Sequence, residues 1–414
     1  MFFNTLKLND RLLRGIAARG YTEATPVQEQ TLTKTLEGFD AAVQSQTGTG
    51  KTAAFLITLF QRMLQERPAI RKRALIIVPT RELAAQIEEE AVLLNRYIGF
   101  KIGSFYGGVG YGPQLKMLKT GVDIMIGTPG RLLDLSQRGV LKLGDTGFLV
   151  IDEADRLFDM GFLPDLRNLL RKMPPPHARQ SMLFSATLDR ISRGIAAEYL
   201  NHPSIIELTP EQVTVETISQ ELYRVKSHIK DNLLLGILQK SAPRNALIFT
   251  NMRHAAFKLA KKLKLNGYHS HYLTGDLTQM ERSKVLEEFK EGRFPFLVAT
   301  DVAARGLHID GLEMVINYDL PQDCENYIHR IGRTARAGNS GRAVSLACEK
   351  FSKHLEAIES YIGMQIPIKT FGSELFATDR SLEFMARKKG QPRRHQKNGF
   401  KNGPSKHRPR HRTL

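Results

Sequence analysis

The octapeptide Ser45-Gln46-Thr47-Gly48-Thr49-Gly50-Lys51-Thr52 decides the fold of this chain. Residues 41–44 before it run from apolar to polar and predict a buried strand, and the apolar residues 53–57 after it predict the start of a helix. Strand, glycine-bearing turn and helix form a P-loop, in which backbone N–H groups and the helix N-terminus surround the phosphates of a nucleotide. The alternative is a Thr/Gly-rich surface turn that is followed by an isolated lysine.

The residue types of the octapeptide suit a phosphate. Gly48 and Gly50 let the backbone bend and approach an anion without a Cβ in the way. Lys51 supplies a positive charge to the outer phosphates, and the Thr52 hydroxyl can ligate Mg²⁺. Ser45 stands where the usual pattern has a further glycine. We therefore expect residues 45–52 to bind a nucleotide.

Length and composition limit the classes of protein to which this chain can belong. A chain of 414 residues with 42% hydrophobic residues can build two or three globular domains. No stretch approaches the ~18 consecutive apolar residues of a membrane span, and the first residues lack the pattern of an export signal. Two widely spaced cysteines, Cys324 and Cys348, fit a reducing compartment better than a disulfide framework or a zinc site. We expect a cytoplasmic protein that makes no membrane contact.

The net charge of +18 is unevenly distributed. Residues 387–414 contain eleven Lys or Arg and no Asp or Glu, among Gly, Pro and Asn residues that predict disorder. A basic tail on a modestly basic body indicates a polyanionic partner, with nucleic acid as the first candidate and a tail that only improves solubility as the alternative.

Apolar runs alternate with helical patterns along most of the chain. Such an alternation predicts parallel sheets that are covered on both faces. The pattern loosens after residue 202 and then resumes, so we expect an α/β fold of two similar domains with one nucleotide motif and a cleft between them. The predicted boundaries are 1–208 for the nucleotide-binding domain, 209–218 for a linker, 219–371 for the second domain and 372–414 for a largely disordered tail.

Asp152 and Glu153 follow the apolar residues 148–151. The carboxyl end of a buried parallel strand is where α/β folds bind ligands. There Asp152 can hold Mg²⁺ against the β- and γ-phosphates, and Glu153 can polarise the attacking water. The alternative is an acidic cluster at a helix N-terminus.

Three arginines, Arg330, Arg333 and Arg336, recur at intervals of three. If a helix extends that far, this spacing places them on one face. A solvated basic face is the ordinary interpretation, but an NTPase needs positive charge on the γ-phosphate, which arginine fingers supply. On the second domain, Arg333 and Arg336 would couple hydrolysis to closure of the cleft.

Taken together and in order, these motifs resemble the DEAD-box ATP-dependent RNA helicases over roughly residues 3–371. The stretches that carry the resemblance in the first domain are 20–28 with Phe3 upstream, 45–52, 79–83, 107–108, 128–131, 152–155 and 185–187. In the second domain they are 247–249, Gln279 with Arg282, 300–306 and 329–336.

The resemblance implies two tandem RecA-like domains and further site residues. Gln28 would read adenine, Phe3 or Tyr21 would stack on its ring, and Asp301 would complete the ATP site. Coupling between the two domains is implied for Ser185, Thr187 and His329. The residues implied to hold the RNA backbone are Thr80, Arg81, Gly108, Thr128, Arg131, Gln279, Arg282, Thr300 and Gly306.

Within the family, the sequence most resembles the bacterial helicases that partner the endoribonuclease RNase E in the RNA degradosome. Two other interpretations stay open: a non-enzymatic RNA-binding module, against which Lys51, Glu153 and Arg336 argue, and a DNA-directed helicase.

Overall fold

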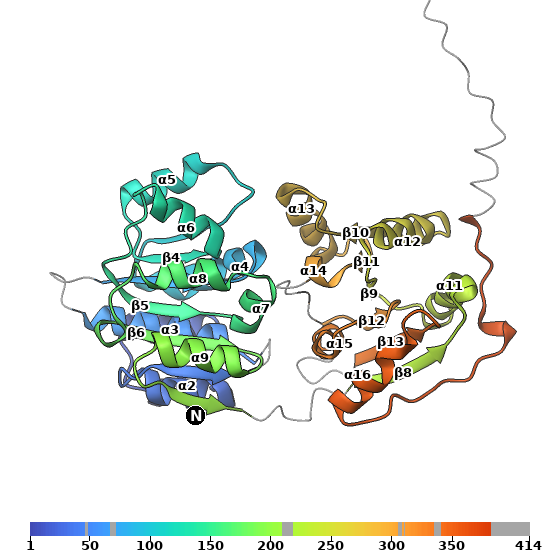
Figure 1. Cartoon of the computed structure of the whole chain (residues 1–414), viewed down its shortest axis with the longest axis horizontal. Helices are drawn as coiled ribbons and strands as arrows, with labels where there is room; N and C mark the ends of the chain where they lie inside the picture. Colours follow the sequence, from blue (N-terminus) through green and yellow to red (C-terminus); the bar gives the residue numbers. More distant parts are fainter. Residues whose placement is uncertain are drawn as a thin grey trace, which may run out of the picture.

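The computed structural model describes residues 1–45, 49–66, 72–208, 218–304, 309, 311–334 and 341–381. Two α/β lobes lie next to each other in Figure 1, each built around its own parallel sheet. The predicted fold class is confirmed: each sheet is parallel throughout its described pairings and has helices on both faces.

The first sheet has seven strands in the order β3-β4-β2-β5-β6-β1-β7. Its central strands are short apolar runs whose residues are almost all buried, as expected where helices cover both faces. The strands are β1 (Ala41–Gln44), β2 (Arg73–Ile77), β3 (Ile102–Phe105), β4 (Ile124–Gly127), β5 (Thr146–Ile151), β6 (Gln180–Ser185) and β7 (Ser204–Glu207).

The helices of the first lobe pack their apolar positions into two clusters, one on each face of this sheet. They are α1 (Asp10–Ala18), α2 (Pro26–Thr35), α3 (Lys51–Gln65), α4 (Arg81–Leu94), α5 (Tyr111–Thr120), α6 (Pro129–Gln137), α7 (Ala154–Asp159), α8 (Leu163–Leu170) and α9 (Arg190–Tyr199). Short 3₁₀ turns lie at Phe3–Thr5, Asn95–Tyr97 and Pro176–Ala178.

The second sheet has six strands in the order β10-β11-β9-β12-β13-β8. The strands are β8 (Ile218–Arg224), β9 (Ala246–Phe249), β10 (Ser270–Leu273), β11 (Phe296–Ala299), β12 (Met314–Asn317) and β13 (Gly341–Ala347). The helices around it are α11 (Lys230–Ser241), α12 (Arg253–Leu265), α13 (Gln279–Lys290), α14 (Asp301–Ala304), α15 (Cys324–Ile331) and α16 (Leu355–Ile362). Short 3₁₀ turns lie at Ser227–Ile229, Ser352–His354 and Ser373–Leu375.

Parallel register gathers the predicted site residues of the first lobe at one edge. Ile151 pairs with Ile77 on one side and with Leu183 on the other, so β2 and β5 end at the same level and β6 ends two residues beyond. Ser45, Thr80, Thr128, Asp152 and Ser185 lie at or shortly after the carboxyl ends of β1, β2, β4, β5 and β6. Since parallel strands point the same way, residues far apart in the sequence meet at one edge.

The chain after α16 does not leave the second lobe at once. Ile368 forms a bridge with Leu222 of β8, and Asn232 of α11 exchanges hydrogen bonds of 3.1 and 2.9 Å with the backbone of Ala377. The fading apolar pattern assigns residues 372–381 to the tail, but the structure packs them on the lobe, because Leu375, Phe376 and Ala377 cover its apolar cluster. The boundary at 371 is therefore about ten residues too early, while residues 382–414 lie outside the described part.

The prediction that the three arginines share one helical face is wrong. Helix α15 ends at Ile331, and the backbone of Arg333 and Thr334 turns back by i to i−3 hydrogen bonds. Gly332 disfavours helix, and the Thr334 hydroxyl donates to the carbonyl of Leu312, which draws the chain away from the helix axis. Arg333 therefore follows the helix, and Arg336 lies outside the described residues.

Candidate active site between the two lobes

The described part of the P-loop ends on a helix N-terminus. Gly50 has φ of +91°, a conformation that favours glycine, and directly precedes α3. The first residue of α3, Lys51, is buried with its Nζ 3.1 Å from Asp152 Oδ1. Ser45 and Thr49 join their hydroxyls at 2.5 Å, and Thr52 is half-buried. Gln46, Thr47 and Gly48 lie outside the described residues.

Lys51 keeps its charge in this site. Burial alone would lower the pKa of its ammonium group, but three carboxylates outweigh burial and raise that pKa above its ordinary value. They belong to Asp152, Glu153 and Asp155. A buried, charged lysine at a P-loop suits the outer phosphates of a nucleotide.

Gln28 ties α2 to the P-loop. Its side-chain oxygen accepts from the backbone N–H of Thr25 at 2.9 Å, which completes a capping box, and its Nε2 donates to the carbonyl of Gly50 at 3.0 Å. Thr25, which sequence reasoning left without a role, donates its hydroxyl to the carbonyl of Thr49 at 2.8 Å. Each amide atom of Gln28 still has capacity for one further hydrogen bond.

The two candidate adenine-stacking rings differ in exposure. Phe3 is only 2% exposed and packs in the core, whereas Tyr21 is half-buried, with its ring centroid 6.3 Å from that of Phe3. The Tyr21 hydroxyl donates to Glu90 Oε1 at 2.8 Å, and burial together with this carboxylate raises its pKa to about 12. Of the two rings, Tyr21 is the one with accessible surface.

Asp152 is fully buried at the end of β5 and uses only one of its carboxylate oxygens. Oδ1 accepts from Lys51 and, at 2.8 Å, from the backbone N–H of Glu153. Oδ2 is buried without a hydrogen-bond partner among the described residues. A buried carboxylate oxygen without a hydrogen-bond partner fits Mg²⁺, which proteins bind through one or two carboxylates plus substrate phosphates. Among the described residues there is no group of three or more His, Cys, Asp or Glu side chains that could hold a metal ion.

Glu153 is held in an unusual backbone conformation. Its φ of 51° and ψ of 53° lie in the left-handed region, and its Oε2 accepts from Arg156 at 3.0 Å. Burial would raise the pKa of Glu153, but nearby cations hold that pKa below its ordinary value. The basic side chains that lower it are those of Arg156, Lys51, Arg333 and His329. Since Arg333 and His329 come from the second lobe, both lobes act on this carboxylate.

Arg330 is structural rather than free to reach a phosphate. It is 1% exposed and pairs with both oxygens of Asp301 at 2.6 Å, and it also bonds the carbonyl of Asp319 and the amide oxygens of Asn251 and Asn317. Sequence spacing treats Arg330 like Arg333, but its buried contacts make it the anchor that orients Asp301. Its partners lie up to 79 positions away, so only the fold brings them together.

Of the residues expected to couple the lobes, Ser185 lies against the acidic strand end. Ser185 accepts a hydrogen bond from the backbone N–H of Asp155 at 3.2 Å, and its carbonyl accepts from Ser45 at 2.8 Å. The side chain of Ser185 thus touches the acidic segment, and its backbone touches the P-loop. Thr187 and His329 are half-buried.

On the first lobe, the candidate RNA residues are fixed by local contacts. Thr80 caps α4, and Arg81 lies so close to Gly108 (φ +80°) that a Cβ there would be 1.7 Å from its guanidinium nitrogen. Arg131 donates to Gln114 at 2.9 Å and lies 4.1 Å from the ring centroid of Tyr111. Thr128 precedes α6 directly.

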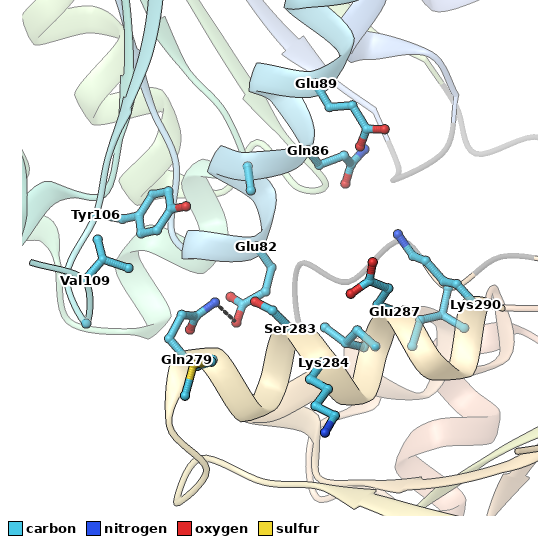
Figure 2. Close-up of a pocket in the computed structure, with 15 residues that line it drawn as sticks. Glu82, Gln86, Glu89, Tyr106, Val109, Gln279, Ser283, Lys284, Glu287 and Lys290 are labelled. Carbon is cyan, nitrogen blue, oxygen red and sulfur yellow. Dashed lines mark hydrogen bonds between the residues drawn. The ribbon is translucent and has the colours of Figure 1, made fainter. Parts of the chain in front are cut away.

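The remaining candidates lie on the second lobe, where two of them contact the first. Arg282 pairs with Glu82 at 2.8 Å, and Gln279 donates to the same carboxylate at 3.3 Å. Figure 2 shows α4 and α13 facing each other here, with a groove of about 720 Å³ between them. Glu82 is a functional candidate that sequence reasoning missed. Thr300 is buried at the end of β11, and Gly306 lies outside the described residues.

The comparisons define the class of this protein. Residues 25–193 match the model of the DEAD/DEAH box helicases, and residues 229–338 match that of the helicase conserved C-terminal domain. The chain belongs to the DEAD-box helicase family, with two tandem RecA-like domains.

Among its relatives are bacterial proteins named ATP-dependent RNA helicase RhlB. The one from Shigella dysenteriae is 45% identical over 382 residues, which covers 91% of each chain, and one from Klebsiella pneumoniae is 44% identical over 99% of this chain and 97% of its own.

Two solved structures share the fold of this chain. Dbp5 from S. cerevisiae, bound to RNA and ADP BeF3, is 31% identical and superposes with a TM-score of 0.78 over 89% of this chain and 95% of its own. Mss116p bound to ssRNA and AMP-PNP is 28% identical, with a TM-score of 0.79 over 91% of this chain and 81% of its own. The described part of this chain contains no helix that is both long and apolar enough to cross a membrane.

Proposed function

We propose that the protein is an RNA-stimulated ATPase that separates short RNA duplexes locally. The observation that carries the proposal is the contact between the lobes on the candidate RNA side, where Arg282 and Gln279 of the second lobe bond Glu82 of the first at 2.8 and 3.3 Å. Hydrolysis then depends on how the lobes sit together, because Glu153 belongs to the first lobe and the candidate arginine fingers belong to the second. RNA that favours the closed arrangement would therefore favour hydrolysis.

The residues at the ATP end have separate roles. Lys51 neutralises the outer phosphates, Gln28 presents its remaining donor and acceptor to adenine, and Tyr21 or Phe3 packs on the base. Thr52 and Asp152 would hold Mg²⁺, which neutralises charge on the β- and γ-phosphates when bound. Glu153 orients and deprotonates the attacking water. Arg333 and Arg336 stabilise charge on the transferred phosphoryl group, and Asp301 is held toward the site by Arg330.

The candidate RNA residues bind a sugar-phosphate backbone. Arg81, Arg131 and Arg282 supply positive charge. The side-chain amide of Gln279, the threonine hydroxyl groups and the backbone of the two glycines supply hydrogen bonds. The residues are Thr80, Arg81, Gly108, Thr128, Arg131, Gln279, Arg282, Thr300 and Gly306. Backbone contacts fix position without reading sequence. A single strand held across both lobes is bent away from its partner strand, which is then released.

The test is ATP-dependent separation of a short RNA duplex, with a non-hydrolysable ATP analogue for comparison. The proposal is supported if the protein separates duplexes repeatedly with ATP but does not do so with the analogue. Binding of RNA without any ATP-dependent separation would instead indicate a non-enzymatic RNA-binding module.

We further propose a role in RNA turnover in the cytoplasm, alongside an endoribonuclease such as RNase E in a degradosome. Its support is the likeness to proteins named RhlB over 91% of the chain or more. Co-purification of the tagged full chain with RNase E from the native cell, resistant to RNase treatment, would test this role. Loss of the association after RNA digestion would contradict a direct protein contact.

The nucleotide preference can be tested at Gln28. A side-chain amide donates and accepts at once, which matches the donor–acceptor edge of adenine but not that of guanine. ATP should therefore support duplex separation far better than GTP, and Gln28→Ala should reduce this preference. Because Gln28 also bonds Gly50, the variant is expected to lose ATP affinity as well. Equal rates with ATP and GTP in the wild-type protein would contradict the assignment.

The basic tail can be tested by ending the chain near Ala386. Lys and Arg side chains bind phosphates by releasing counterions, so the shortened protein should need more RNA but reach the same maximal ATPase rate. For each phosphate of single-stranded RNA that the tail no longer neutralises, the salt slope of binding should fall by ~0.7. Unchanged affinity and slope would assign the tail to protein docking or solubility.

A further inference from the structure

Helix α12 carries an exposed basic and aromatic stripe that the proposed mechanism does not use. The stripe consists of Arg253, Phe257, Lys258, Lys261 and Lys264, all of them exposed. Arg253, Phe257, Lys261 and Lys264 recur every three or four positions along one side of the helix, and Lys258 directly follows Phe257. The helix contains no acidic residue. In the described part of the chain no ion pair involves Lys258, Lys261 or Lys264, whereas Lys262, on the inner side, pairs with Asp231 and Asp379.

An aromatic ring lies within this row of cations. Phe257 is 49% exposed, and its ring lies at right angles to that of Tyr272 in the edge strand β10, with ring centroids 5.3 Å apart. The contact with Tyr272 packs one part of the ring and leaves about half of the side chain exposed. Cations beside a fixed, exposed aromatic ring are the elements of a single-strand binding surface, in which bases stack and phosphates pair.

The two ends of α12 connect the stripe to the rest of the molecule. At its start, Arg253 pairs with Asp276 at 2.7 Å, just before α13 and its RNA candidates Gln279 and Arg282. At its end, Asn266 donates to Asp379 at 2.9 Å and accepts from the backbone of Arg380 at 2.8 Å. The helix thus runs from the interlobe RNA residues to the point from which the basic tail continues. Figure 1 shows α12, β10 and α13 together on the upper side of the second lobe.

We infer that the α12 stripe is a second RNA-binding surface, which holds a single-stranded segment that extends beyond the interlobe site. The inference rests on the proposed RNA binding between the lobes. Continuity with Gln279 and Arg282 favours RNA over an acidic protein as the ligand. Phosphates pair with the three lysines, and one base packs on Phe257. The surface adds affinity for long strands and takes no part in ATP chemistry.

The test compares two RNA lengths in the full chain, because a surface outside the interlobe site matters only for long strands. The variant combines Lys258→Gln, Lys261→Gln and Lys264→Gln, and the matched control combines Lys240→Gln, Lys353→Gln and Lys369→Gln, three exposed lysines elsewhere on the same lobe. Single strands of about 8 and about 24 nucleotides bracket the usual reach of one binding track.

For the longer RNA we expect the stripe variant to bind about tenfold more weakly and its salt slope to fall by about 2, as expected when three phosphates are no longer neutralised. Phe257→Ser should weaken binding of the longer RNA by at least about fivefold, the scale of removing one base stack. The shorter RNA should bind and stimulate ATP hydrolysis as in the wild type.

The inference would be overturned if the stripe variant bound the longer RNA as tightly as the control variant does. An equal loss for both lengths would also overturn it, because the substitutions would then act on the interlobe site. A loss of binding to polyglutamate with unchanged RNA binding would assign the stripe to an acidic protein instead. Stimulation by the shorter RNA reports on the proposed function separately, so failure of the stripe and failure of that function remain distinguishable.

Discussion

Replacing Arg333 with alanine is expected to lower RNA-stimulated ATP hydrolysis by about 10³-fold, the low end for arginine fingers. Arg333 is buried just beyond α15, and its charge lowers the pKa of Glu153 on the other lobe. Its position therefore suits a group that meets the γ-phosphate only when the lobes close. We expect the same loss for Arg336→Ala. Affinity for ATP without RNA should change little, since Lys51 and Gln28 belong to the first lobe.

The control for both variants is Arg293→Ala. Arg293 is an exposed arginine of the same lobe whose partners, Glu288 and Glu291, are its near neighbours. Steady-state hydrolysis at saturating RNA and ATP measures the effect, and titration with an ATP analogue measures binding. Normal stimulated turnover in Arg333→Ala would remove Arg333 from the mechanism. An equal loss in Arg293→Ala would show that the effect is not specific to the site.

Replacing Glu153 with glutamine is expected to reduce the turnover number by at least ~10²-fold, the usual scale for removing a general base. Nearby cations keep the pKa of this carboxyl below its ordinary value, so Glu153 is ionised at neutral pH and can accept a proton from water. Glutamine has nearly the same shape and can still accept the hydrogen bond from Arg156. The fold and the affinity for ATP should therefore be retained.

Thermal unfolding and binding of an ATP analogue provide the check that Glu153→Gln is intact. The matched substitution Glu198→Gln changes an exposed carboxylate of the same lobe that pairs with Arg167 at 3.7 Å and should leave turnover within about twofold. Wild-type turnover in Glu153→Gln would exclude Glu153 as the base. A loss of ATP binding would show that the residue acts in binding rather than in the chemical step.

The sequence predicts the central strands and the places where they end, because both follow from local pattern. Residues 148–151 are apolar throughout, so they predict a strand buried on both faces, and the acids that follow must lie at its carboxyl end. The edge strands β7 and β8 fall where the apolar pattern loosens and are missed. Their residues alternate between exposed and buried, and polar side chains such as Gln220 and Glu221 occupy them.

The roles of single side chains depend on partners that spacing does not reveal. Arg330 and Arg333 look equivalent in the sequence, yet Arg330 is enclosed by Asp301 and Asn251, which other strands bring to it. Glu82 belongs to a stretch that suggests RNA contact, yet it bonds Arg282, 200 positions away, across the lobes. Such contacts come from the packing of one element on another, so they become visible only in the folded chain.

The most direct test of the account is the rate of ATP hydrolysis by the full chain with and without single-stranded RNA. The protein should hydrolyse ATP slowly alone, and the rate should rise with RNA to a plateau, because RNA bound to both lobes brings Arg333 toward the phosphate beside Glu153. A rate that is the same with and without RNA, or that rises equally with single-stranded DNA, would contradict it.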